Sequence, residues 1–291
     1  MTTLDASELI LNGDGSIYHL NLVPEELAPT VITVGDPDRV SEVSKHFESV
    51  EVRKGKREFI THTGWCNGKR LSVISTGIGT DNIDIVLNEL DALVNIDFNT
   101  RTVKKNKTSL NIIRIGTTGS IQNELKVDSM LANNYAIGLD GLLHYYQSEA
   151  VQEHDFQDAF SAQINWPSTH PKPYIITADK ELLAIFKDAD LHLGITATNV
   201  GFYGPQSRVL RLPLNNSALI DSLSSFHHKG QKITNLEMET SGIYGLSKLL
   251  GHKAVSLNSV VANRANGTVS EDPKLAMKKL IVFALHKISK I

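Results

Sequence analysis

The sequence has 291 residues, 29 of them basic and 32 acidic, and its formal net charge at pH 7 is −3. Proteins that bind nucleic acids or membrane surfaces carry an excess of basic residues, so this balance argues against both partners. Cys66 is the one cysteine, so no internal disulfide can form. We find neither a basic and apolar leader nor an apolar stretch of the ~20 residues that a membrane span needs. These features predict a cytoplasmic protein.

Short β-branched runs alternate with helical patterns along the chain, which is typical of an α/β sheet. Residues 31–34 predict a buried strand, and a helix follows over about 38–46. Residues 71–74 predict a second strand. Apolar residues over 83–94 then recur at the i, i+3, i+4, i+7 spacing of an amphipathic helix.

The basic, polar segment at 99–107 predicts a solvated loop. The later predicted elements are strands at 111–115, at 233–236 and from 253, a helix over about 238–250 with Gly251 as its C-cap, and a last helix from Asp272 and Pro273 to about 288. We predict one α/β domain over residues 1–291.

Three predicted strand ends carry glycine beside arginine or threonine, at 35–39, 76–79 and 114–119. Glycine lets backbone N–H groups approach an anion, and guanidinium groups bind phosphate oxygens in pairs. Each segment alone is consistent with an ordinary strand-to-helix turn. Together at one sheet edge, they predict an oxyanion site.

Other common nucleotide and hydrolase motifs are missing or incomplete. Gly77 and Gly79 follow a strand, but Asn82 stands where a dinucleotide-binding fingerprint has its third glycine. The sequence has no Walker A motif, no Gly-x-Ser-x-Gly elbow and no His-Glu-x-x-His motif. Cys66 fits a small buried residue better than a nucleophile.

Two further segments are candidates for ligand contacts. Glu237 and Glu239 flank Met238, and their carboxylates suit paired sugar hydroxyls, although the pattern alone favours a charged helix start with Met238 in the core. The segment from Phe202 to Arg208 offers an aromatic ring, an amide and a cation, which suit a flat heterocycle with carbonyl and imide edges. A solvated loop is the alternative there.

Taken in order, these segments resemble the family of nucleoside phosphorylases and uridine phosphorylases, and the uridine phosphorylases most closely. The resemblance runs from about His19 to the last helix, which leaves residues 1–18 as an extension and 99–109 as a basic loop insertion. The segments that carry the resemblance are 34–39, 57–59, 75–79, 114–122, 202–208, 237–239 and 263–264.

The resemblance implies one α/β domain with a twisted mixed central sheet, a distorted barrel edge and surrounding helices. It also implies reversible phosphorolysis of a nucleoside, with no cofactor beyond phosphate. The positions that match the family's site are Gly35, Arg39, Arg57, Arg114 and Thr117 for phosphate, His19, Met238 and Glu239 for ribose, and Phe202, Gln206 and Arg208 for the base. Arg208, Gln206 and Arg114 would carry the catalysis.

In this family His19 and Arg57 would reach the site of a neighbouring subunit. The resemblance therefore implies a homodimer as the smallest active unit, and a hexamer of three dimers as the larger alternative. Some family members bind potassium between subunits through positions that match Glu58, Ile78 and a serine, but Asn82 replaces that serine.

The segment 260–264 lacks the aspartate that purine-specific relatives use at N7, and Gln206 and Arg208 are present, so uridine is the expected nucleoside. A phosphorylase of broader or purine specificity and a non-catalytic nucleoside-binding protein of the same fold remain as alternatives. A nucleoside hydrolase would have no use for the phosphate-binding arginines.

Overall fold

A twelve-stranded sheet forms the centre of the computed structural model, which describes residues 3–291. Its strands are β1 (Thr30–Val34), β2 (Ser49–Lys56), β3 (Phe59–Cys66), β4 (Lys69–Ser75), β7 (Asn111–Ser120), β8 (Met130–Gly138), β9 (Tyr174–Thr177), β10 (Leu191–Thr198), β11 (His227–His228), β12 (Gln231–Glu237), β13 (Lys253–Asn263) and β14 (Thr268–Val269). Ten of the strands follow the hydrogen-bonded order β11-β12-β10-β8-β13-β7-β1-β4-β3-β2, while β9 pairs with β8 and β14 pairs with β13. Strand β1 is parallel to β4 and β7, whereas β2 and β3 are antiparallel, so the sheet is mixed.

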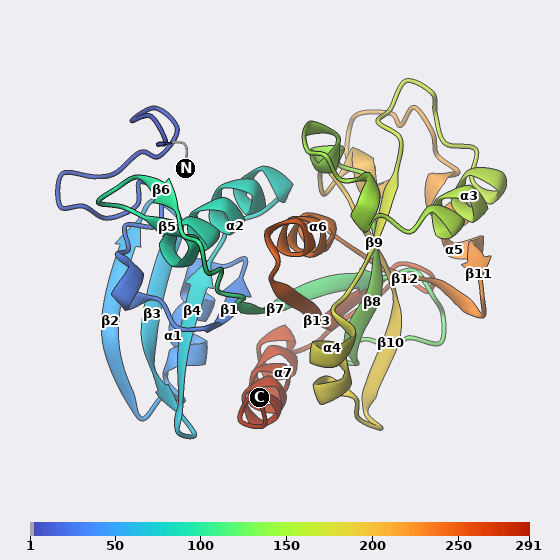
Figure 1. Cartoon of the computed structure of the whole chain (residues 1–291). Helices are drawn as coiled ribbons and strands as arrows, with labels where there is room; N and C mark the ends of the chain where they lie inside the picture. Colours follow the sequence, from blue (N-terminus) through green and yellow to red (C-terminus); the bar gives the residue numbers. More distant parts are fainter. Residues whose placement is uncertain (1–2) are drawn as a thin grey trace.

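One part of the sheet closes on itself. Strand β12 also pairs antiparallel with β7, through Asn235 with Ser120 and Leu236 with Gly119. This pairing makes a ring of β7, β13, β8, β10 and β12, and irregular register between Val260 and Ala262 distorts it. Figure 1 shows β7 and β13 crossing the molecule from the blue N-terminal strands to this ring. The predicted α/β domain with a mixed sheet and a distorted barrel edge is confirmed.

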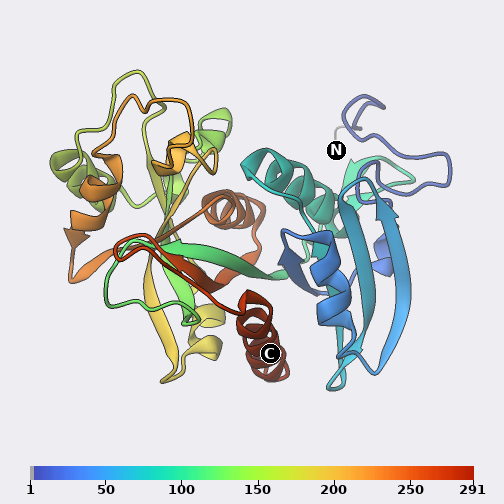
Figure 2. The same cartoon turned by 180° about the vertical axis from the view of Figure 1, so that it is seen from behind.

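Helices cover the sheet on both sides. They are α1 (Pro37–Ser44), α2 (Thr80–Asn95), α3 (His154–Gln163), α4 (Lys180–Phe186), α5 (Leu219–Ser225), α6 (Thr240–Leu250) and α7 (Pro273–Ile288). Figures 1 and 2 show α6 and α7 on opposite sides of β7 and β13. None of the helices within residues 3–291 is long and apolar enough to span a bilayer.

The predicted helix ends follow from their capping residues. The Asp272 carboxylate accepts a hydrogen bond from the N–H of Leu275, and Pro273 takes the first helical position of α7. Gly251 ends α6 with a φ of +81°, which glycine adopts without steric cost. In α2, the predicted apolar face is buried, because Ile83, Val86, Leu87 and Leu90 are all inaccessible to solvent. These predictions are confirmed.

The predicted end of the third strand is wrong. We expected a strand over 111–115 and then a turn at 116–119, but β7 continues to Ser120. Strand β13 pairs with β7 as far as Ser120, and β12 pairs with its last two residues, so the backbone stays extended. Arg114 and Thr117 therefore lie within a strand. Gly116 is required there because a Cβ atom would lie 2.2 Å from Nη1 of Arg114.

The prediction of a solvated loop over residues 99–107 is also wrong in part. It contains β6 (Thr102–Val103), which pairs with β5 (Ile96–Asp97). Arg101 donates hydrogen bonds to the carbonyl oxygens of Leu4 at 2.9 Å and Asp5 at 2.7 Å, and to that of Leu9. The basic segment therefore fixes the N-terminal segment to the end of α2.

Replacing Arg101 with Ala should release the N-terminal segment, because several hydrogen bonds from one cation would be lost together. We expect proteolytic cleavage before residue 12 to be about tenfold faster, with little change in the rest of the fold. Mass spectrometry after limited proteolysis measures this. Lys105→Ala, an exposed change in the same loop, is the matched control, and equal cleavage of both variants would contradict the assignment.

Candidate active site

Most of the predicted site residues surround one cavity of about 700 Å³, at the carboxyl ends of β1 and β4 and beside β7. Ligands of parallel α/β sheets bind at such edges. Nine predicted residues line the cavity: Gly35, Arg39, Arg114, Thr117, Phe202, Gln206, Arg208, Met238 and Glu239. Five further lining residues belong to segments that the sequence analysis named but had no predicted role of their own: Asp36, Pro37, Thr118, Val261 and Ala262.

Arg114 is buried and lines this cavity. Its Nη2 atom lies 2.6 Å from Oε2 of Glu239 and 3.6 Å from Oε2 of Glu237, and its Nη1 atom donates to Oδ1 of Asn258 at 2.5 Å. Burial opposes the charged form of Arg114, but Glu239 and Glu237 outweigh it and raise the pKa of Arg114. Arg114 therefore stays a cation in a position that is almost closed to water.

Arg39 is half-buried in α1 and faces the same cavity. Burial lowers the pKa of Arg39, and the charge of Arg114 adds to this effect although Asp36 opposes it. Within residues 3–291, the Arg39 side chain donates no hydrogen bond and makes no ion pair. An anion between Arg39 and Arg114 would relieve their repulsion, which is what a phosphate site requires.

The two neighbouring glutamates have different roles. The Glu237 carboxylate accepts hydrogen bonds from the backbone N–H groups of Glu239 at 2.9 Å and Thr240 at 2.8 Å, and from the hydroxyls of Thr198 and Thr240. Glu237 therefore caps the N-terminus of α6 and fixes the C-terminal end of β12. Both glutamates line the cavity, but Glu239 accepts hydrogen bonds from Arg114 and from the N–H of Gly79, the latter at 2.9 Å.

Replacing Glu237 with Ala should lower the free energy of unfolding by about 3 kcal/mol, because several buried donors would lose their acceptor. Chemical denaturation measures this loss. Glu271→Ala removes an exposed carboxylate and should change stability by less than about 0.5 kcal/mol. Equal stability of the two variants would contradict the capping role.

The segment after β10 forms the other end of the cavity. Arg208 donates to the Phe202 carbonyl at 2.8 Å and to Oε1 of Gln206 at 2.5 Å, and its Cζ atom lies 3.9 Å from the Phe202 ring centroid. Arg264 donates to the carbonyl oxygens of Gln206 and Ser207. The segment is therefore an ordered loop. Arg264, which directly follows β13, anchors this loop, and the sequence did not reveal that role.

Strand β7 sets the distance between the Arg114 end and the Arg208 end of the cavity. The Arg114 guanidinium packs over Gly116, while a Cβ atom at Gly119 would lie 3.8 Å from Nη2 of Arg208. Three residues of an extended strand cover about 10 Å. The two guanidinium groups thus leave room for a sugar ring between an anion at Arg114 and a flat ring at Arg208.

Two predicted residues do not line this cavity. The backbone N–H and Nδ1 of His19 contact the Glu89 carboxylate on α2, with Nδ1 at 2.7 Å. Arg57 is exposed in the turn between β2 and β3, with a φ of +57°. Arg57 directly precedes Glu58, which does line the cavity.

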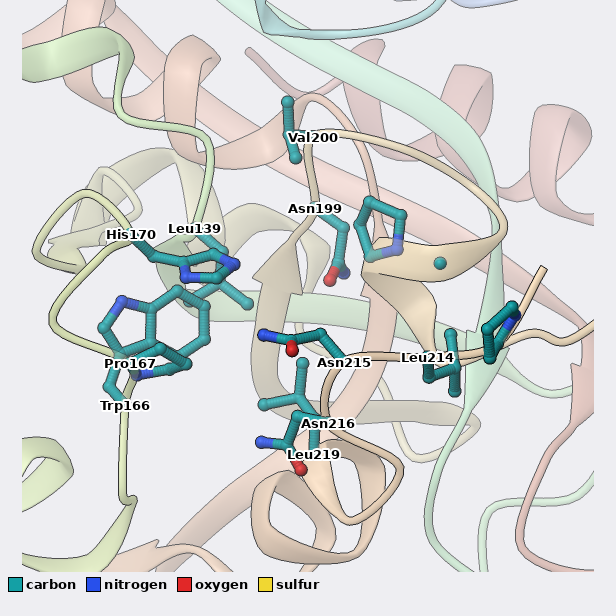
Figure 3. A pocket seen from close by; sticks show the side chains of 13 residues that line it. Leu139, Trp166, Pro167, His170, Asn199, Val200, Leu214, Asn215, Asn216 and Leu219 are labelled. Carbon is teal, nitrogen blue, oxygen red and sulfur yellow. The ribbon is translucent and has the colours of Figure 1, made fainter.

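A second cavity of about 280 Å³ lies behind the loop that carries Gln206. Figure 3 shows Trp166 and His170 on one side of it and Asn199 and Asn215 on the other. No lysine, arginine, aspartate or glutamate lines this cavity. Because an anion needs cationic partners, this second cavity does not suit phosphate.

Comparison with known proteins identifies similar chains over most of the sequence. The profile of the phosphorylase superfamily matches residues 29–284. The uridine phosphorylase of Thermococcus kodakarensis is 29% identical over 86% of this chain and 79% of its own length. A DeoD-type purine nucleoside phosphorylase of Bacillus velezensis is 27% identical over 93% of this chain and 99% of its own.

A solved structure has nearly the same fold. It is a nucleoside phosphorylase from Trypanosoma brucei, described as showing uridine phosphorylase activity. It superposes with a TM-score of 0.88 at 29% identity, over 97% of this chain and 100% of the other.

Proposed function

The chain belongs to the phosphorylase superfamily, and we propose that within it the chain is a uridine phosphorylase, which converts uridine and phosphate to uracil and α-ribose 1-phosphate. The family and its relatives support a phosphorylase that transfers a pentosyl group. One observation carries the uridine assignment. A single cavity has two buried or half-buried arginines at one end and the Gln206–Arg208 pair at the other.

Phosphate would bind between Arg39 and Arg114, with the Thr117 hydroxyl and the N–H at Gly35 as further donors. A phosphate oxygen attacks C1′ of the ribose while the C1′–N1 bond breaks, and the electron pair leaves with the base. Positive charge develops on the sugar and is stabilised by the bound phosphate. Phosphate is itself the nucleophile, so this reaction needs no activated serine or cysteine.

Negative charge develops on the departing base. Arg208 and Gln206 would donate hydrogen bonds to the carbonyl oxygens of the pyrimidine, and these bonds strengthen as the charge appears. Glu239 would accept hydrogen bonds from the ribose hydroxyls, and Met238 would pack against the ring. Phe202 offers an aromatic face to the base.

Two features of the base end support a pyrimidine over a purine. The Gln206 amide has both a donor and an acceptor, which suits the imide edge of uracil. The segment 260–264 contains no aspartate that could protonate a purine ring nitrogen. The similarity to a purine nucleoside phosphorylase makes inosine the second candidate substrate.

Base release from uridine, thymidine and inosine, measured with and without phosphate, tests the proposal. We expect release from uridine that depends on phosphate. Release only from inosine would overturn the pyrimidine assignment, and release without phosphate would indicate a hydrolase. No release from any nucleoside would favour a binding protein.

The proposed active unit is a dimer. His19 and Arg57 lie outside the cavity of their own chain, and in the proposed dimer they would complete the partner's site, for ribose and phosphate respectively. Light scattering measures the assembly. A monomer with full activity would contradict this part of the proposal.

The proposal includes no potassium ion. Nδ2 of Asn82 donates to Oε1 of Glu58 at 3.3 Å. An N–H donor thus lies against one carboxylate oxygen of Glu58, and Asn82 offers no hydroxyl ligand, so the proposed reaction is written without the ion.

A further inference from the structure

Three asparagines form a hydrogen-bonded chain inside the ring of strands. They are Asn133 on β8, Asn235 on β12 and Asn258 on β13, and all three are inaccessible to solvent. Burying an amide group among strands costs free energy unless the group is hydrogen-bonded. A continuous chain of buried amides therefore requires an explanation.

Every bond in this chain runs in the same direction. Arg114 donates to Oδ1 of Asn258 at 2.5 Å, Asn258 donates to Oδ1 of Asn133 at 2.8 Å, and Asn133 donates to Oδ1 of Asn235 at 2.8 Å. Asn235 then donates to the Thr118 hydroxyl at 2.8 Å, and Thr118 donates to the Leu236 carbonyl at 2.7 Å. Hydrogen bonds aligned head to tail polarise one another, so the chain fixes each amide in one orientation.

Both ends of the chain lie at the cavity. Arg114 is at the phosphate end, and Thr118 and Leu236 line the wall farther along β7 and β12. The Asn258 amide is held by Asn133 and also donates to Ser256, at 3.2 Å. Its oxygen can therefore point only toward Arg114.

We propose that Asn258, oriented by Asn133 and Asn235, is a positioning residue that holds the Arg114 guanidinium for phosphate binding without neutralising it. This inference rests on the proposed phosphate site. Arg114 already faces the Glu239 and Glu237 carboxylates, at 2.6 and 3.6 Å. With Arg39 included, two arginines balance these two carboxylates, so a third carboxylate would give the phosphate end a net negative charge, whereas an amide oxygen fixes the guanidinium and adds no charge.

The replacement Asn258→Asp tests the charge part of this inference, because it changes shape little and puts an anion beside Arg114. We expect the KM for phosphate to rise about tenfold or more, while the KM for uridine changes less than about twofold. Asn258→Leu removes the acceptor without adding charge and should have a smaller effect on the same constant. Calorimetric titration with inorganic phosphate gives the binding constant without catalysis.

Asn95→Asp is the matched control. Asn95 is equally buried, on α2, and bonds Thr108 and Asp91 away from the cavity. If phosphate binds Asn258→Asp as tightly as the unchanged protein, or if the leucine variant binds phosphate more weakly than the aspartate variant, the inference is overturned. If the Asn258→Asp variant does not fold, phosphate binding by the Asn258→Leu variant tests the inference alone. Phosphate affinity unchanged in Asn258→Leu would contradict the positioning role. Failure of the unchanged protein to bind phosphate would instead overturn the proposed function.

Discussion

Replacing Arg114 with Ala should reduce kcat/KM for phosphorolysis by about 10³-fold and also destabilise the fold. The rate falls because the phosphate loses its buried cation. The stability falls because the buried carboxylates of Glu239 and Glu237 lose their cationic partner. Breaking a buried ion pair by removing one member costs about 3–5 kcal/mol. Steady-state kinetics and chemical denaturation measure the two losses separately.

A second substitution separates these two effects. Arg114→Ala combined with Glu239→Gln removes the unpaired carboxylate, so part of the lost stability should return while activity stays absent. Arg114→Lys keeps the charge but not the planar fork, and we expect intermediate stability with poor phosphate binding. Normal phosphate affinity in Arg114→Ala would show that the anion binds elsewhere.

Replacing Arg208 with Ala should reduce kcat/KM for uridine by about 10²-fold to 10³-fold while phosphate binding stays intact. Arg208 is only half-buried and bonds Phe202 and Gln206 within its own loop, so its loss should leave the Arg114 end unchanged. The effect should fall mainly on kcat, since the hydrogen bond to the base strengthens as negative charge develops. Kinetics with uridine and calorimetry with phosphate give the two quantities.

Arg211→Ala is the control for this experiment. Arg211 is an exposed arginine of the same loop that does not line the cavity, so its loss should leave uridine turnover within about twofold of the unchanged protein. If Arg208→Ala weakens phosphate binding instead of uridine turnover, Arg208 belongs to the phosphate end and the base assignment is wrong.

Local signals in the sequence predicted several elements well. Helix α7 has an aspartate and a proline at its start, and α2 has a regular apolar face, so both depend on residues close in the chain. The order of motifs then gave the family and nine of the residues around the cavity. Each of those residues belongs to a short segment with its own pattern.

Features that depend on distant pairing were missed. Strand β7 continues through Gly116 and Gly119 because β13 and β12 pair with it, and no local pattern encodes those partners. Asn258 is 144 residues from Arg114 in the chain, and it is one of several polar residues in β13, so no local pattern distinguishes it. Likewise, the adjacent Glu237 and Glu239 look equivalent until the donors from Thr198 and Thr240 distinguish them.

The anchoring of the Phe202–Arg208 loop has a consequence for how such an enzyme can change during evolution. Its contacts to the base are held by bonds within the loop and by Arg264, whereas Arg114 is embedded in the paired strands of the ring. Mutations in the loop can therefore accumulate without disturbing the phosphate end. A lineage could exchange one nucleobase for another by altering a few residues of this loop, while the same number of changes around Arg114 would cost both the fold and the reaction.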